Sequence, residues 1–420
     1  MESSSGLNIA VVGSGVAGIV AAWLLQRKHR VTLFEKNDYV GGHTHTIVLK
    51  DGPDAGTPVD TGFIVHNDRT YPNFIRFITQ LGVERIKCPM SFSYYDRNTG
   101  FCFASAAPFA DPKNISRFSY WKFIYEIFRF NRLTLEATKK NRFGDLTLGQ
   151  FLAKNRFGPT FIRQYIIPMG AAIWSTPDDQ MMDFPAATFA RFFENHGLLS
   201  VKDHPQWYSI KGGSCEYVKA FLKTFNGAVH TSSPVRQILR QNNQVTLKLD
   251  GAESTFDAVV LAAHADETFQ MLADPSSAET RLLSAWHYTN NQTVLHSDPS
   301  YLPPLAKARS SWNYLREKQT TDVMPMSMTY DMNILHCLKT VNNYCVTLNP
   351  QKEIPEERKI DEFMYAHPQF TSASIATQKE LDSLNGQRNT YFCGSYFRYG
   401  FHEDAVLSGV NVAQKFGISL

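Results

Sequence analysis

The stretch Leu7-Asn8-Ile9-Ala10-Val11-Val12-Gly13-Ser14-Gly15-Val16-Ala17-Gly18 decides the fold. Its first half is mostly apolar and β-branched, which predicts a buried parallel strand. In its second half, the first glycine allows a tight turn and the second lets the backbone approach a pyrophosphate. The third glycine lets a helix pack closely on the strand. The alternative is a glycine-rich turn in an unrelated α/β protein.

The residues after this turn complete a dinucleotide-binding unit. A helix is predicted over Ile19–Lys28, and its N-terminus would direct partial positive charge at the phosphates. A second strand is predicted over Val31–Phe34, and Glu35 follows it directly. An acid at this place can bind both ribose hydroxyls. The unit as a whole therefore predicts dinucleotide binding.

Length, charge and cysteine content exclude several classes of protein. The chain has 420 residues, which suggests two or three domains, and 54 of them are aromatic. Its 42 basic and 39 acidic side chains are too balanced for a protein that mainly binds nucleic acid. Six scattered cysteines indicate a reduced, cytoplasmic protein, and no motif suggests a metal site. The uncharged run Ser3–Gln26 could suggest a membrane helix or signal peptide, but Glu2 and the glycines oppose this.

A second glycine pair, Gly41-Gly42, lies within the stretch Glu35–Thr44. From here the chain resembles the flavin-containing amine oxidase and phytoene desaturase superfamily. The resemblance implies FAD as the cofactor, with the glycine pair passing under its flavin end. His43 stands where the family usually has Arg. The segment Val59–Phe63 resembles the family's Asp-x-Gly strand beside the flavin ring, and a helix is predicted over Tyr71–Leu81.

The C-terminal segment resembles the closing motif of the same family. A strand is predicted over Asn389–Cys393, and a helix containing Ser408-Gly409 follows. Asp404 stands where the family usually has Gly. The residues that fit the motif are Gly394, Glu403, Ala405, Ser408 and Gly409.

The middle of the chain carries a third matching block. Lys211-Gly212-Gly213 precedes a predicted helix over Glu216–Phe225. A strand is predicted at Val229–Thr231. A β-meander that includes Pro234–Ile238 and Gln244–Leu249 follows, and then a buried strand over Phe256–Ala263. The resemblance implies that the backbone of Val235 holds the adenine.

These blocks predict an α/β FAD-binding domain of Rossmann type, similar to glutathione reductase, with an α+β substrate domain. The FAD-binding domain is assigned to residues 1–86, 206–264 and 386–420, and the substrate domain to residues 87–205 and 265–385. The predicted cofactor-binding residues are Gly13, Ser14, Gly15, Val16, Ala17, Gly18, Glu35, Lys36, Gly41, Gly42, His43, Thr44, Thr61, Gly62, Phe63, Val235, Gly394, His402, Glu403 and Ala405.

Two features stand out in the predicted substrate domain. Ser91–Asp96 alternates with period two and leads through Asn98-Thr99-Gly100 into Phe101–Phe103, which predicts a β-hairpin. Residues 113–142 carry eight basic and two acidic side chains, and Phe118, Trp121, Tyr125 and Phe128 recur at helical spacing. One interpretation is a helix that contacts a membrane surface, on the inner face for a cytoplasmic protein. The other is a helix covering the substrate lobe with a solvated basic face.

Flavin chemistry needs orientation, a dry cavity and one base. The candidates for that base are His43, His45, His66 and His402, because the matched segments place them near the flavin and histidine is suited to proton transfer near neutral pH. The alternative for each is a hydrogen-bonded scaffold residue, which is the more frequent role of such a histidine. The predicted substrate channel consists of Tyr396, Tyr399, Phe401 and Trp174.

Three parts of the sequence resemble a narrower group within this family: His43, the run Val59–Pro72 and the block Trp174-Ser175-Thr176-Pro177. These residues are similar to a bacterial subgroup that resembles the flavoprotein domain of plant cyclopropane fatty-acid synthases. The subgroup is also similar to flavoproteins of methyl-branched and furan fatty-acid pathways. This resemblance implies work on phospholipid acyl chains, by hydride transfer from an allylic carbon to the flavin N5.

Three functions stay open from the sequence. The first is a lipid-directed oxidoreductase that desaturates, saturates or isomerises an acyl or isoprenoid chain. The second is an amine oxidase that uses oxygen, whose usual flavin-side lysine could be Lys307, Lys318 or neither. The third is a non-catalytic FAD-binding partner of a lipid methyltransferase.

Overall fold

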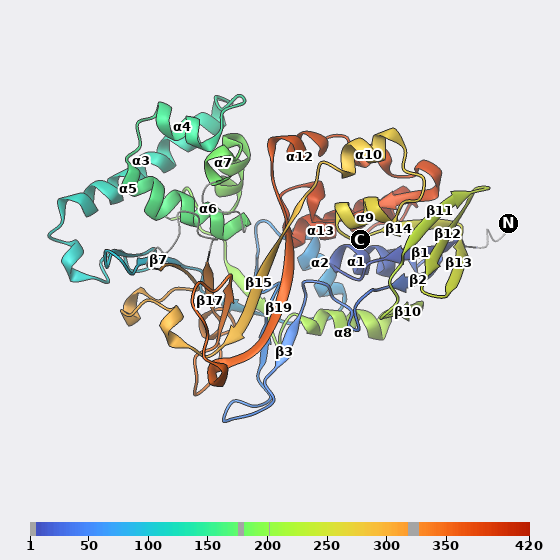
Figure 1. The fold of residues 1–420 in the computed structure, drawn as a ribbon, viewed down its shortest axis with the longest axis horizontal. Helices are drawn as coiled ribbons and strands as arrows, with labels where there is room; N and C mark the ends of the chain where they lie inside the picture. The colour runs from blue at the N-terminus through green and yellow to red at the C-terminus, as the bar shows by residue number, and fades with distance from the viewer. Residues whose placement is uncertain (1–5, 175–179, 201, 318–326) are drawn as a thin grey trace.

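The first sheet of the molecule is built around the predicted dinucleotide-binding strand. In this computed structural model, which describes residues 6–174, 180–200, 202–317 and 327–420, β1 lies in the middle of five parallel strands (Figure 1). In spatial order the strands are β10 (Ala228–His230), β2 (Arg30–Phe34), β1 (Asn8–Val12), β14 (Ala258–Leu261) and β20 (Thr390–Phe392). All five come from the segments assigned to the FAD-binding domain, although the domain boundaries themselves stay a prediction.

Helix α1 (Val16–Leu25) is buried along its whole length. It begins three residues earlier than predicted because Gly15 itself is the N-cap. The C-terminal helix α13 (His402–Lys415) packs against it, and a Cβ atom on Gly409 would lie 2.5 Å from the carbonyl oxygen of Ala17. Gly409 therefore serves close helix packing. The other helices of this domain are α2 (Pro72–Gln80) and α8 (Cys215–Thr224).

A three-stranded meander extends this domain, with β11 (Gln237–Gln241), β12 (Gln244–Leu249) and β13 (Ala252–Phe256). The predicted single strand over Phe256–Ala263 is wrong, because Phe256 ends β13 and Ala258 begins β14. The chain changes sheets at Asp257, which is held by Asn8 at the start of β1. The amide of Asn8 donates to the Asp257 carboxylate (2.7 Å), and the amide of Asp257 donates to the Asn8 carbonyl (2.9 Å).

The second large sheet has seven strands in the order β19-β15-β18-β17-β16-β7-β8. Its long antiparallel pair, β15 and β19, crosses the centre of Figure 1. The predicted hairpin is confirmed, since β7 and β8 pair antiparallel. The strands are β7 (Phe92–Asp96), β8 (Cys102–Ala104), β15 (Tyr288–His296), β16 (Trp312–Arg316), β17 (Met328–Asp331), β18 (Cys345–Leu348) and β19 (Lys359–Pro368).

A helical lobe adjoins this sheet, at the upper left of Figure 1. It consists of α3 (Phe118–Lys139), α4 (Leu148–Lys154), α5 (Pro159–Phe161), a π-helical turn (Ile162–Ile166), α6 (Ile167–Trp174) and α7 (Ala186–Asn195). Phe123 and Phe130 of α3 pack inward with Phe161 and Phe189 in one aromatic core. Part of the aromatic excess therefore fills this lobe. The block after Trp174, Ser175–Pro177, lies outside the described residues.

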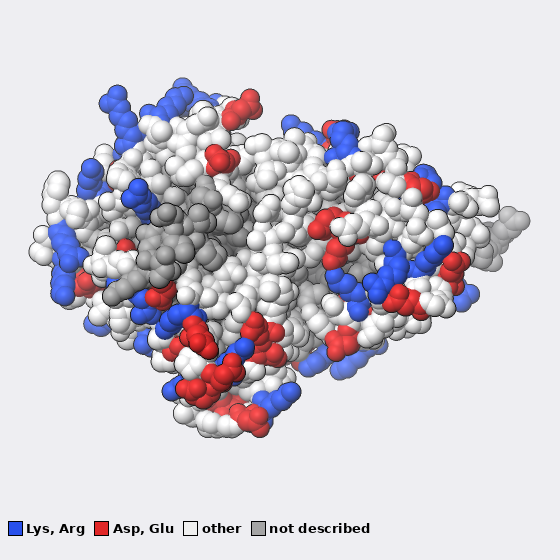
Figure 2. Space-filling model, in the orientation of Figure 1, with Lys and Arg blue, Asp and Glu red and all other residues white. Residues whose placement is uncertain are grey.

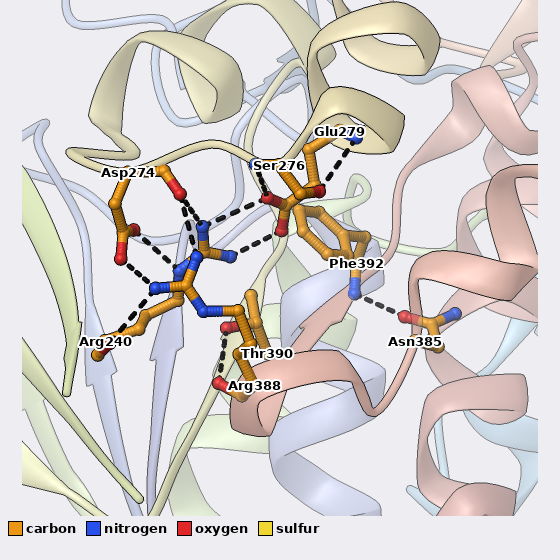
Figure 3. A network of polar contacts seen from close by, with 8 residues as sticks. All are labelled: Arg240, Asp274, Ser276, Glu279, Asn385, Arg388, Thr390 and Phe392. Atoms are coloured by element: carbon orange, nitrogen blue, oxygen red, sulfur yellow. Dashed lines mark hydrogen bonds and ion pairs between the residues drawn. The ribbon is translucent and has the colours of Figure 1, made fainter. Parts of the chain in front are cut away.

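An ion-pair network joins the meander to the start of β20 (Figure 3). Arg240 of β11 is buried and binds both Glu279 of α10 (Ser277–Leu283) and Asp274, with 3.0 Å from its Nε to Asp274 Oδ1. Arg388 pairs with the same Asp274. Segments 237–241 and 387–389 were assigned to the FAD-binding domain, and segment 274–283 to the substrate domain. The network thus links the two predicted domains. No helix in the described part of the chain is both long and apolar enough to cross a bilayer.

Candidate active site

One continuous cavity of about 1750 Å³ runs between the five-stranded sheet and the substrate domain. It extends from Ser233 and Val235 at one end to Phe109 and Trp121 at the other. Pockets for a single drug-sized ligand usually measure about 300–1,000 Å³. The cavity therefore has room for a large cofactor together with a substrate.

The first glycine turn forms one wall of this cavity. Each of its three glycines has the local geometry that its predicted role requires. Gly13 has φ +100°, and a Cβ atom there would lie 2.9 Å from the Ala262 carbonyl oxygen. A Cβ on Gly18 would lie 2.0 Å from the Gly13 carbonyl oxygen, so Gly18 serves packing and does not line the cavity. A Cβ on Gly15 would meet nothing within 4 Å. Gly15 thus leaves open space beside the N-terminus of α1, where a pyrophosphate would bind.

Glu35 lies at the end of β2 with its carboxylate held in place. The amide and hydroxyl of Ser14 donate to Glu35 Oε2 at 2.9 and 2.6 Å, and the amide of Asn37 donates to Oε1 at 2.9 Å. Glu35 and Val235 both line the cavity. Lys36 lies at the rim and pairs with Glu267 at 2.5 Å. This end of the cavity fits the ribose and adenine of a dinucleotide.

The second glycine pair packs directly on the first turn. Gly41 bridges to Gly15, and a Cβ on Gly42 would lie 3.0 Å from the Gly15 Cα. The carbonyl of His43 accepts a hydrogen bond from the Phe63 amide (2.7 Å). These contacts bring the cavity-lining segments 13–17, 41–43 and 61–63 together as the sequence predicted.

Besides Gly18, three predicted site residues do not line the cavity, and we correct their assignment. The hydroxyl of Thr44 hydrogen-bonds to the Tyr217 hydroxyl. Glu403 accepts hydrogen bonds from the amides of Asn73 (3.1 Å) and Phe74 (2.9 Å), so its carboxylate caps α2. His66 is fully buried, does not line the cavity, and neither ring nitrogen has a hydrogen-bond partner among the described residues.

A histidine cluster lines the cavity beside the second glycine pair. The ring centroid of His43 lies 6.0 Å from that of His264 and 5.5 Å from that of His367. Burial lowers the pKa of all three imidazoles, to about 3 for His264 and for His367, where nearby histidines add to the effect. These rings are therefore neutral near pH 7.

The sequence missed two members of this cluster, His264 and His367, together with Tyr365. His264 follows the buried strand β14, and the residue after a parallel strand is a usual place for a ligand contact. Tyr365 and His367 alternate along β19, and the Tyr365 hydroxyl hydrogen-bonds with the Thr61 hydroxyl (2.8 Å) and with Nδ1 of His45 (3.0 Å). His45 is thus a hydrogen-bonded member of the cavity wall.

His402, the first residue of α13, also lines the cavity. Its ring stacks on Phe63, with centroids 3.5 Å apart, and its Nε2 hydrogen-bonds with the Tyr217 hydroxyl (3.1 Å). Gly394 and Ala405 line the cavity beside it. The Gly394 amide donates to the Ser408 hydroxyl (2.8 Å), which ties β20 to α13.

Asp404, the departure from the family's glycine, has a structural role. It lies outside the cavity and accepts hydrogen bonds from the amides of Tyr399 (3.2 Å) and Phe401 (3.0 Å). The carboxylate therefore closes the turn before α13. Burial raises its pKa to about 6.

The remaining part of the cavity is the predicted substrate channel, and Tyr396, Tyr399, Phe401 and Trp174 all line it. Aromatic and aliphatic side chains of the helical lobe continue the wall to Trp121 and Phe109. Among the described lining residues, the only ones with Asp, Glu, Lys or Arg side chains are Glu35, Lys36, Arg236 and Glu267, which all belong to the ribose and adenine end. Lys307 is exposed and does not line the cavity, and Lys318 lies outside the described residues.

Comparison with known proteins identifies the family. The sequence model of the flavin-containing amine oxidoreductases matches residues 16–323. The chain belongs to this family. It is therefore an FAD-dependent oxidoreductase, with an FAD-binding Rossmann-type domain and a substrate domain.

Three similar proteins show how far this oxidoreductase has diverged. A Mycobacterium tuberculosis protein named flavin-containing monoamine oxidase AofH is 25% identical over 343 residues, which are 78% of this chain and 71% of the relative. A 1-hydroxycarotenoid 3,4-desaturase of a Flavobacterium species is 31% identical over 112 residues, 26% of this chain and 21% of the relative. The crystal structure of a fatty acid isomerase from P. acnes that produces CLA has a TM-score of 0.70 at 16% identity, and the match covers 99% of each chain.

The cavity fits the FAD that the family implies. The open space at Gly15 accepts the pyrophosphate, Glu35 is placed for the ribose, and Val235 lines the adenine end. The segments around Gly42 and Thr61 are placed for the flavin end, and they meet the histidine cluster and the uncharged channel there. One cavity of the oxidoreductase thus has room for the FAD and for a substrate beside it.

Proposed function

We propose that this oxidoreductase acts on lipid acyl chains, as a fatty-acyl desaturase. The observation that carries the proposal is the uncharged channel, whose described lining residues have neither carboxylate nor cationic side chains. Burying an unpaired charge is costly, so such a wall favours a long apolar chain over an amino acid or a diamine. The 31% identity to a carotenoid desaturase over part of the chain agrees with an apolar substrate.

FAD supplies the two-electron acceptor, which takes a hydride at its N5. Desaturation breaks one C–H bond as a hydride and the neighbouring C–H bond as a proton, and it leaves a C=C bond. The chain must therefore hold the acyl group still, exclude water and accept one proton. The two electrons leave for dioxygen or another acceptor.

The side chain that we propose as the acceptor of that proton is His43, which lines the cavity within the histidine cluster. Its ring hydrogen-bonds to the Ala366 backbone, and its Nε2 has no hydrogen-bond partner among the described residues. Burial lowers its pKa, so the imidazole is neutral and holds a free lone pair. His367 is different, because its Nδ1 is hydrogen-bonded by the Asn291 side-chain amide (2.9 Å).

An amine oxidase is the second candidate, and the match to AofH over 78% of the chain favours it. An uncharged aromatic channel also accepts a neutral monoamine. The two candidates differ in the compound that reduces the flavin. In an amine oxidase, amines and not lipids would reduce it, and reoxidation in air would produce hydrogen peroxide.

A comparison of membrane lipids tests the proposal. Cells supplied with methyl-branched monounsaturated phospholipids should contain a new, more unsaturated acyl species only when they express the wild-type protein. The Gly15→Val variant is the matched control, because its side chain would fill the pyrophosphate space. Identical acyl profiles with bound FAD confirmed by absorbance would contradict the proposal. A flavin that neither lipids nor amines reduce would indicate a non-catalytic partner, for example of a lipid methyltransferase.

A further inference from the structure

Helix α3 presents an apolar face that the fold leaves uncovered. Its inner side, with Tyr120, Phe123 and Phe130, is buried in the lobe. Phe118 is nevertheless 85% exposed and Tyr125 61% exposed, so these aromatic side chains are not part of the core. We call the following exposed residues the α3 patch: Phe109, Ile115, Phe118, Trp121, Tyr125 and Phe128.

Basic side chains surround this patch. Lys113, Arg117, Lys122 and Arg132 are exposed, and the structure shows no ion pair for any of the four within the residues it describes. On the face drawn in Figure 2, Lys and Arg side chains lie along the outer edge of the helical lobe with uncharged surface between them. Of the two acidic residues of α3, Glu126 is buried and accepts a hydrogen bond from the Gly158 amide (2.8 Å), and Glu136 is exposed in the last turns of the helix, beyond the aromatic residues of the patch. The exposed surface is therefore apolar with a positive border.

The α3 patch is continuous with the cavity. Trp121 and Phe128 line the cavity and are 48% and 53% exposed, and Phe109, whose ring centroid lies 5.1 Å from that of Trp121, is 40% exposed. Residues that both line a cavity and reach solvent mark an opening. Phe109, Trp121 and Phe128 thus frame a mouth of the substrate channel, and Phe118 and Tyr125 lie outside the cavity lining.

We propose that the α3 patch docks on an anionic phospholipid bilayer and places this mouth against the membrane. Aromatic rings are favoured at the level of the lipid headgroups, and Lys and Arg side chains bind anionic headgroups around them. That an acyl chain enters here rests on the function proposed above. A mouth at the bilayer lets the chain move from lipid into the channel without exposing its methylene groups to water.

Vesicle binding by the FAD-loaded full-length protein tests the docking surface. We expect wild type to bind phosphatidylcholine vesicles that contain phosphatidylglycerol at least about tenfold more tightly than vesicles of phosphatidylcholine alone, and added salt should reduce this difference. The double variant Phe118→Ser/Tyr125→Ser should lose about tenfold or more in binding. Lys122→Glu/Arg132→Glu should lose a similar factor on the anionic vesicles only.

Matched controls come from exposed residues away from α3. The controls are Val341→Ser, at a residue that is 78% exposed, and Lys379→Glu, at an exposed lysine. Vesicle binding by both variants should stay within about twofold of wild type. Equal binding by wild type and the two α3 variants would overturn the proposal. So would an oligomer of the wild type that Phe118→Ser/Tyr125→Ser dissociates, because the patch would then be covered by a second copy.

Docking and catalysis can fail separately in these experiments. A fatty-acyl substrate dispersed in detergent does not need the bilayer, so it should reduce the flavin of wild type and of Phe118→Ser/Tyr125→Ser at the same rate. If no acyl substrate reduces the flavin while vesicle binding behaves as expected, the proposed function fails and the docking surface stands. If dispersed substrate works but binding does not depend on α3, the docking proposal fails alone.

Discussion

The imidazole of His43 lies 5.5 Å from that of His367, ring centroid to ring centroid, and the two rings offer different hydrogen-bonding groups. The Asn291 side-chain amide is oriented by the Asn349 side chain (2.8 Å) and by the Thr289 carbonyl (3.1 Å), so its NH₂ group faces Nδ1 of His367. His367 therefore keeps its proton on Nε2 and can donate. His43 bonds to the Ala366 backbone, and its Nε2 has no hydrogen-bond partner within the described part of the chain.

Replacing His43 should slow flavin reduction more than replacing any other histidine. We expect His43→Ala, with FAD saturated, to lose about 10²–10⁴-fold in the rate of reduction by substrate, as for loss of a general base. His66→Leu is the control, because His66 does not line the cavity, and its rate should match wild type. The measurement is stopped-flow reduction without oxygen.

The pH profile of the same rate tests whether its proton acceptor has the lowered pKa of a buried histidine. A proton acceptor stops working only when pH falls below its own pKa, and burial lowers the pKa of His43 below the ordinary 6.5. As pH falls, the wild-type rate should therefore decline about a midpoint that lies below 6.5. A loss of rate centred near pH 6.5, or an unchanged rate in His43→Ala, would count against this role.

Substitutions at two glycines of the first turn should affect cofactor binding and folding separately. A side chain at Gly15 meets open space, so Gly15→Val should fold normally and lose FAD. A Cβ at Gly18 would lie 2.0 Å from a backbone oxygen, so Gly18→Ala should be destabilised by roughly 1–3 kcal/mol or more. Circular dichroism with flavin absorbance checks both. Strong FAD binding by Gly15→Val would show that the pyrophosphate lies elsewhere.

The buried pair Arg240 and Glu279 should tolerate a double replacement better than a single one. Arg240→Met leaves the buried Glu279 carboxylate without its cationic partner and should cost about 3–5 kcal/mol in the free energy of unfolding, whereas Glu279→Gln should cost less because Arg240 keeps its ion pair with Asp274. Arg240→Met/Glu279→Gln should cost less than the sum of the two single changes. Urea unfolding of all four proteins gives the coupling energy. Additive effects would mean that the two side chains do not interact strongly.

Asp404 should reduce stability at neutral pH. Its pKa of about 6 is above the ordinary 3.8, so the folded protein holds a proton that the unfolded chain has released between these values. The favourable contribution is present below about pH 4 and is lost as pH rises through 6. Asp404→Asn, which keeps an acceptor oxygen, should therefore be more stable than wild type at pH 7.5 by up to about 3 kcal/mol, and the difference should shrink at pH 4.5. Unfolding curves with the same difference at both pH values would contradict this.

The parts of the site that the sequence predicted are those set by local spacing. The turn Gly13–Gly18, the acid Glu35 and the pair Gly41-Gly42 lie where short-range motifs place them. Val235, which the family resemblance assigned to the adenine, also lines the cavity, although β11 begins only at Gln237 and Val235 lies in the segment before it.

The parts that were missed depend on packing between distant segments. Glu403 fits a motif by position, but the amides that its carboxylate binds belong to Asn73 and Phe74, about 330 residues earlier. His264 and His367 meet His43 only because β14 and β19 converge on the second glycine pair. The exposure of Phe118 and Tyr125 likewise could not follow from helical spacing, which is the same for a buried and an exposed aromatic stripe.

Anaerobic reduction of the bound flavin tests the central claim most directly. The FAD-loaded protein is mixed without oxygen with anionic vesicles that contain methyl-branched monounsaturated phospholipids, and separately with a set of primary amines. Flavin absorbance is followed, and the lipids are then analysed by mass spectrometry. We predict that the lipid vesicles bleach the flavin, that one acyl double bond appears for each flavin reduced, and that the amines leave the flavin oxidised. A flavin that amines bleach and lipids do not would contradict the assignment to acyl chains.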